Sequence, residues 1–144
     1  MVNSRAKGAQ FERSIANYLT DELCGANEKF VRDLEQYREG DHGDIVAQGM
    51  PNFPFIIECK RYKSGDGMRP DWWGQAKRAA TRAGKLPCVI YKFDRQPIWV
   101  AVSWEAIGAM NGVEYNEDDL VFMNLESFAF VAREIMSAER ISNG

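Results

Sequence analysis

The 144-residue chain has little of what metal-thiolate, disulfide-bonded or membrane proteins need. It contains one histidine and three cysteines, Cys24, Cys59 and Cys88, which are odd in number and widely spaced. Two of them lie in apolar, strand-like runs, so we expect reduced thiols and neither a zinc site nor a disulfide framework. No apolar run approaches the ~18 residues of a membrane span, and residues 1–7 lack the apolar core of a signal peptide. We therefore expect a soluble, intracellular protein of the cytoplasm.

An excess of positive charge is also lacking, because 18 Lys and Arg face 21 Asp and Glu. The net charge of −3 argues against a nucleic-acid partner until it is followed along the chain. Residues 58–93 carry nine basic residues against three acids, whereas residues 94–144 carry three against nine. A local basic surface can bind phosphates on an acidic protein, so a nucleic-acid partner stays open.

The length and the 45% hydrophobic content are those of one domain with a sizeable core. We find no repeats and no low-complexity linker. We expect a single domain over residues 1–144, with a core at about 5–102 and a C-terminal helical extension at 103–144.

Hydrophobic periodicity predicts alternating helices and strands. Helices are expected at residues 6–23, 72–83, 104–110 and from 125 onward, the last three with N-caps at Asp71, Ser103 and Asn124. Strands are expected at residues 30–34, 45–47, 53–60, 87–93 and 97–102, with a further edge strand at 120–123. This order predicts an α/β fold.

The strand at residues 53–60 ends in an unusual way, with Glu58 and Lys60 following an apolar run. Residues two apart in a strand share a face, so these two side chains stand roughly 7 Å apart, with Ile56 on their face and Ile57 and Cys59 on the other. An incidental ion pair at a solvated strand end is the simpler explanation. A functional role needs support from elsewhere in the chain.

Two further carboxylates supply that support. Glu12 lies at the edge of the apolar stripe of the first helix, and Asp44 opens a strand after a glycine-containing loop. Glu12 is equally explained as a boundary residue reaching water, and Asp44 as a loop cap. His42 is more easily explained as a loop residue than as a ligand, with a minor role left open.

Together, three carboxylates and a lysine at the ends of successive elements suit metal-assisted phosphodiester hydrolysis. Carboxylate oxygens are the ligands that Mg²⁺ or Mn²⁺ prefers, and a nearby cation stabilises the charge that develops on the phosphate.

The same residues, in order and spacing, resemble the PD-(D/E)xK nuclease superfamily. That resemblance assigns the catalytic site to Glu12, Asp44, Glu58 and Lys60, with Gln75 on the following helix. The chain departs from the superfamily pattern at Gly43, where the superfamily name implies a proline before the aspartate. Within the superfamily, the motif Lys7-Gly8-x-x-Phe11-Glu12-Arg13 and the short chain look most like archaeal-type and phage Holliday junction resolvases. The resemblance covers roughly residues 5–102.

The resemblance implies a restriction-endonuclease-like core, with a central mixed sheet of about five strands flanked by helices. It implies Mg²⁺, replaceable by Mn²⁺, held by Asp44, Glu58 and the carbonyl of Cys59, and by Glu12 directly or through water. Lys60 would orient or activate the attacking water. The resemblance also implies a branched DNA substrate, which would be held by Arg5, Lys7, Arg61, Lys63, Arg69, Lys77, Arg78 and Arg82.

A resolvase cuts two strands symmetrically, so the resemblance also implies a homodimer, with the helices at 104–110 and 125–136 as candidate interfaces. Three alternatives stay open: a restriction, repair or recombination nuclease of the same fold acting on duplex or single-stranded DNA, a non-catalytic DNA-binding module, and a structural or interaction protein. The acidic tail is at odds with the broad positive surface expected of a resolvase.

Overall fold

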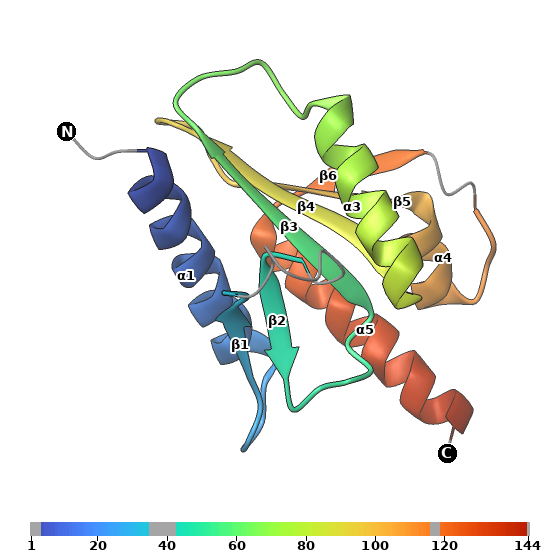
Figure 1. Ribbon diagram of the computed structural model, residues 1–144. Helices are drawn as coiled ribbons and strands as arrows, with labels where there is room; N and C mark the ends of the chain where they lie inside the picture. The colour runs from blue at the N-terminus through green and yellow to red at the C-terminus, as the bar shows by residue number, and fades with distance from the viewer. Residues whose placement is uncertain (1–3, 35–42, 116–118, 144) are drawn as a thin grey trace.

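A mixed sheet of six strands runs through the middle of the computed structural model, which describes residues 4–34, 43–115 and 119–143 (Figure 1). In both spatial and chain order the strands are β1 (Lys29–Arg32), β2 (Ile45–Gln48), β3 (Phe55–Tyr62), β4 (Leu86–Phe93), β5 (Trp99–Ser103) and β6 (Leu120–Met123). Strands β3 and β4 are parallel, and all other neighbours are antiparallel. The predicted α/β fold with a central mixed sheet is confirmed, with six strands where about five were expected.

Helices cover both faces of this sheet. Helix α1 (Ser4–Leu23), helix α4 (Trp104–Asn111) and helix α5 (Leu125–Asn143) contribute to the main core on one face. Helix α3 (Pro70–Ala83) lies on the other face, over β3 and β4 (Figure 1). The sheet therefore separates α3 from the other three helices.

The side chains of β3 alternate between these two layers. Phe55, Ile57 and Cys59 are buried in the main core. Ile56 packs instead against Ala79 and Ala80 of α3, whose small side chains allow the helix to approach the sheet closely. The two-residue period thus places Glu58 and Lys60 on the α3 face, as the sequence predicts.

Two of the three predicted N-cap residues, Ser103 and Asn124, stand at the predicted position. Asn124 caps α5, because its side-chain oxygen accepts a hydrogen bond from the Ser127 N–H at 2.8 Å. Asp71 is not the cap of α3: the helix begins earlier, with Arg69 at the N-cap and Pro70 in the first turn, where a missing N–H costs nothing. Ser103 stands at the N-cap of α4 without a side-chain capping bond.

The C-terminal segment adds both a strand and core residues to the fold. Strand β6 pairs with β5, and Phe128, Ala132 and Ile135 of α5 are buried in the main core. The extension predicted as helical therefore includes an edge strand and completes the hydrophobic face over the sheet. Among the described residues, no helix is long and apolar enough to cross a membrane.

Candidate active site

The site begins where β2 separates from β3. Their register contains a single pair, Ile45 with Ile57, beyond which β2 turns away (Figure 1). Asp44 lies on the other side of this pair, just before β2 begins: its N–H donates to the Ile57 carbonyl at 2.8 Å, and its carboxylate accepts the Cys59 N–H at 2.7 Å. The Asp44 side chain thus occupies the place that a further residue of β2 would take in the ladder.

Gly43 allows this close approach. A Cβ built at Gly43 would overlap the Ile57 carbonyl oxygen and lie 2.8 Å from the Ile57 nitrogen. Backbone atoms of a central strand cannot shift without a large cost in free energy. A side chain at position 43, including a proline ring, would therefore push Asp44 away from β3. The departure from the superfamily name at this position has a steric cause.

Glu58 is the partner of Asp44, and both side chains are buried, with 5% and 9% of their surface exposed. Burial, together with the neighbouring Asp44 carboxylate, raises the pKa of Glu58 to about 8. Burial also raises the pKa of Asp44, although the Cys59 N–H that donates to it opposes this shift. At neutral pH the two groups share one proton, which resides on Glu58.

Lys60 is directed toward α3. Its ammonium donates to the side-chain oxygen of Gln75 at 2.8 Å. The structure therefore brings Gln75, predicted from its place on the following helix, into contact with the predicted catalytic lysine. The lysine still lowers the pKa of both Asp44 and Glu58, so it lies within electrostatic reach of the acidic pair.

Glu12 stands apart from this pair. Its carboxylate forms an ion pair with Arg32 of β1 at 2.8 Å. Glu12 nevertheless lies within electrostatic reach of the acidic pair. The Asp44 charge raises the pKa of Glu12, and the Glu12 charge raises the pKa of Glu58. Arg32 is the cation that holds Glu12 at this edge.

The oxygen atoms around Asp44 and Glu58 are candidate ligands of a divalent cation. In residues 4–34, 43–115 and 119–139, no three His, Cys, Asp or Glu side chains are placed to hold an ion together. Asp44 and Glu58 nevertheless fit one as a pair, because two buried carboxylates can both ionise only beside a cation. The carbonyl of Cys59 faces the same strand edge as its N–H, which adds a third hard oxygen. Glu12 as a ligand stays a prediction, and His42 lies outside the described residues.

The predicted DNA-binding residues divide into two groups. Lys63 follows β3, Arg69 precedes α3, and Lys77, Arg78 and Arg82 lie along α3. Arg5 and Lys7 lie in the first turns of α1, and Arg61 is near the end of β3.

Asp94 ties two members of the second group together. Its carboxylate pairs with Lys7 at 2.9 Å and with Arg61 at 2.7 Å, which lowers the pKa of Asp94. Arg61 also donates to the Tyr62 carbonyl and has 13% of its side chain exposed. Lys7 and Arg61 thus join α1 to the end of the sheet, which leaves Arg61 the least available of the predicted phosphate contacts.

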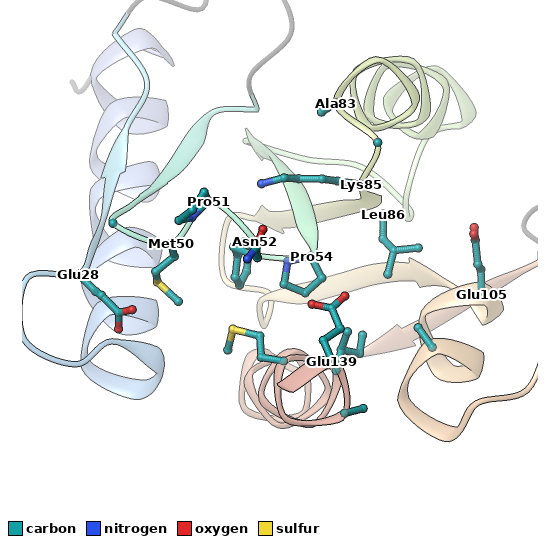
Figure 2. A pocket seen from close by; sticks show the side chains of 17 residues that line it. Glu28, Met50, Pro51, Asn52, Pro54, Ala83, Lys85, Leu86, Glu105 and Glu139 are labelled. Carbon is teal, nitrogen blue, oxygen red and sulfur yellow. The ribbon is translucent and has the colours of Figure 1, made fainter. Parts of the chain in front are cut away.

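A recess lies elsewhere, at the end of the sheet where β3 begins (Figure 2). It has a volume of about 1290 Å³, and none of its lining residues is a predicted site residue. Figure 2 shows Met50, Pro54 and Leu86 at its wall and the carboxylate of Glu139 at its rim.

Three contributors were missed by sequence reasoning. Arg32, Asp94 and the steric need for Gly43 depend on contacts between segments far apart in the chain. Only Tyr62 carried a local signal, because it follows Lys60 by two residues and therefore shares its face of the strand.

A family model for phage PDDEXK endonucleases matches residues 3–135. The chain belongs to this family. Its core is the restriction-endonuclease-like fold, and the nuclease function expected from the resemblance is supported by the family. The match extends well past residue 102 and so includes most of the segment that the sequence resemblance did not cover.

Among solved structures, the chain is similar to Hjc, a Holliday junction resolvase of the archaeal hyperthermophile Archaeoglobus fulgidus. The identity is 16% and the TM-score 0.49, with 90% of this chain and 98% of that chain covered. A comparison with curated proteins gave no match.

The raised pKa of Glu58 predicts a pH-dependent stability of the metal-free protein. The ordinary pKa of Glu is 4.5 and the folded value about 8, so the folded state binds more protons between these values. The free energy of unfolding should therefore fall as pH rises from 4.5 to about 8, by on the order of a few kcal/mol. Urea unfolding in EDTA across this range measures it. Glu58→Gln should flatten the profile, and equal slopes in both proteins would contradict the prediction.

Gly43→Ala should displace Asp44 and lower the free energy of unfolding by about 1–3 kcal/mol, because the new Cβ overlaps the backbone of β3. Gly8→Ala is the matched control: a Cβ there meets nothing within 4 Å, and alanine favours the interior of α1. Urea unfolding of both variants should show a loss at position 43 and no loss at position 8. A loss of the same size at both positions would argue against the steric role of Gly43.

Proposed function

We propose that this protein is a Mg²⁺-dependent DNA endonuclease that hydrolyses phosphodiester bonds at the fork between β2 and β3. The observation that carries the proposal is the buried Asp44–Glu58 pair, which lies within electrostatic reach of Lys60. Membership of a phage PDDEXK endonuclease family supports the reaction class. The metal, the substrate structure and the residue roles below belong to the proposal.

Asp44, Glu58 and the Cys59 carbonyl are the groups that would hold the cation. When bound, a divalent ion supplies Lewis acidity and lowers the pKa of a coordinated water. Glu58 would give up its proton on metal binding, as the raised pKa of this residue requires. The hydrogen bond from the Cys59 N–H fixes the orientation of the Asp44 carboxylate.

Lys60 would orient the attacking water and stabilise the negative charge that develops on the phosphate. Gln75 positions it, because the amide oxygen accepts one of the three ammonium protons and leaves two for water and phosphate. Glu12 would act through a water molecule, since Arg32 binds its carboxylate.

Branched DNA is the proposed substrate, in the manner of a Holliday junction resolvase. The alternative is duplex or single-stranded DNA cut by the same site in restriction, repair or recombination. The comparison that separates them uses a four-way junction, a linear duplex and a single strand of matched sequence.

Cleavage of these three substrates should require Mg²⁺ or Mn²⁺ and stop in EDTA. Asp44→Asn and Lys60→Ala should each lower the rate by at least about 100-fold, because the first removes a proposed ligand of the cation and the second removes the positive charge beside the reacting phosphate. Gel assays under single-turnover conditions measure the rates.

Asp21→Asn, at an exposed position of α1 nine residues beyond Glu12, serves as a charge-neutralising control and should retain cleavage. The proposed endonuclease activity would be refuted if Asp44→Asn or Lys60→Ala cleaved DNA at the wild-type rate. It would also be refuted if the metal-loaded wild type cleaved none of the substrates. Binding with a steep salt dependence but no cleavage would instead indicate a DNA-binding module.

A homodimer is the proposed assembly, since symmetric cleavage needs two sites. Large apolar side chains that α4 and α5 leave exposed fit this role: Trp104 is 41% exposed and Phe130 51% exposed. Sedimentation equilibrium should give twice the 16.4 kDa chain mass, and Phe130→Glu or Trp104→Glu should shift it toward the monomer. A monomer mass for the wild type at micromolar concentration would contradict this.

A further inference from the structure

An aromatic ring is exposed next to the proposed active site. Tyr62 follows Glu58 and Lys60 on the same face of β3, and 42% of its surface is exposed. Two residues of extended strand separate Lys60 and Tyr62 by roughly 7 Å. The ring is therefore within reach of the nucleotide beside a phosphate held at Lys60.

The Tyr62 ring is held rigidly from behind. It stacks on Trp72 with a centroid distance of 5.2 Å and an interplanar angle of 12°. Trp72 is 2% exposed and in turn packs on Tyr91 and Phe93 at 5.8 and 6.2 Å. A ring fixed in this way loses little further freedom when a second planar group stacks on it.

The segment that follows Tyr62 is fixed against the same cluster. A Cβ at Gly65 would overlap the ring of Phe93, so the backbone of Gly65 lies directly on that ring. The guanidinium of Arg69 lies 5.9 Å from the centroid of the Trp72 ring. Basic side chains able to hold phosphates, among them Lys63 and Arg69, therefore flank the exposed tyrosine.

We propose that Tyr62 is a stacking platform for an unpaired nucleobase adjacent to the scissile phosphate, an inference that rests on the proposed nuclease function. In a continuous duplex both faces of each base are covered by its neighbours, so a protein ring finds no base face to stack on. A branch point, a strand end or a single strand exposes one. Tyr62 thus selects DNA whose base stacking is interrupted at the site of cleavage.

The test compares equilibrium binding of a four-way junction, a single strand and a continuous duplex in EDTA, so that no strand is cut. Tyr62→Leu, which still covers Trp72, should weaken binding of the junction and the single strand about tenfold. Binding of the continuous duplex should not change. Tyr62→Phe keeps a stacking ring and should bind like the wild type.

Tyr115→Leu is the matched control. Tyr115 is also an exposed tyrosine, 47% exposed, and lies against a tryptophan, Trp104, at 5.7 Å, but at the C-terminal side of α4. Its replacement should leave all three affinities unchanged. The assignment would be overturned if Tyr115→Leu lost as much affinity as Tyr62→Leu, or if Tyr62→Leu lost as much affinity for the continuous duplex as for the junction. It would also be overturned if Tyr62→Leu lost no affinity.

A spectroscopic measurement on the wild type tests the contact without relying on a variant that must fold. 2-Aminopurine placed at the branch point should lose fluorescence on binding, as stacking quenches it, and Tyr62→Phe should preserve the quenching. Unchanged or increased fluorescence at every position around the branch would overturn the assignment. Failure to cleave would refute the proposed function alone, because both measurements report binding without chemistry.

Discussion

The candidate site depends on the hydrogen bond from the Cys59 N–H to the Asp44 carboxylate. This bond gives the Cys59 N–H a partner at a point of β3 to which the ladder with β2, the single pair Ile45–Ile57, does not extend. It also holds Asp44, just before β2, beside Glu58 of β3. Gly43 is part of the same arrangement, because only a residue without a Cβ can pass so close to the Ile57 backbone. The backbone fork, the acidic pair and the glycine are consequences of one constraint.

The charges around this fork are compensated unevenly. Lys60 is held by Gln75 and Glu12 by Arg32, so the outer charged groups each have a protein partner. The central carboxylates share a proton instead, because burial makes two adjacent negative charges costly. A proton held in this way is readily exchanged for a divalent cation. The electrostatics therefore favour ion binding at Asp44 and Glu58, with Glu12 in an outer position.

The parts of the site that follow local rules were predictable from the sequence. The period of a strand placed Glu58 and Lys60 on one face and Cys59 on the other, whereas Gln75 was assigned to the site only by the family resemblance. The contacts of Glu12 with Arg32, and of Asp94 with Lys7 and Arg61, link segments 20 to 87 residues apart, and no local pattern encodes them. The start of α3 was missed although its signal is local: Pro70 stands in the first turn, so that Asp71 is not the cap.

The sheet also resolves the conflict between an acidic protein and a DNA substrate. Lys77, Arg78 and Arg82 lie on α3, on the same face as Glu58, Lys60 and Tyr62. The acidic residues of the C-terminal segment, such as Glu126 and Glu134, belong to α5 in the layer across the sheet. Since screening limits surface charges to roughly 10 Å, the two layers act separately on a bound strand. A net charge of −3 is therefore compatible with the proposed binding of phosphates by the basic residues of α3.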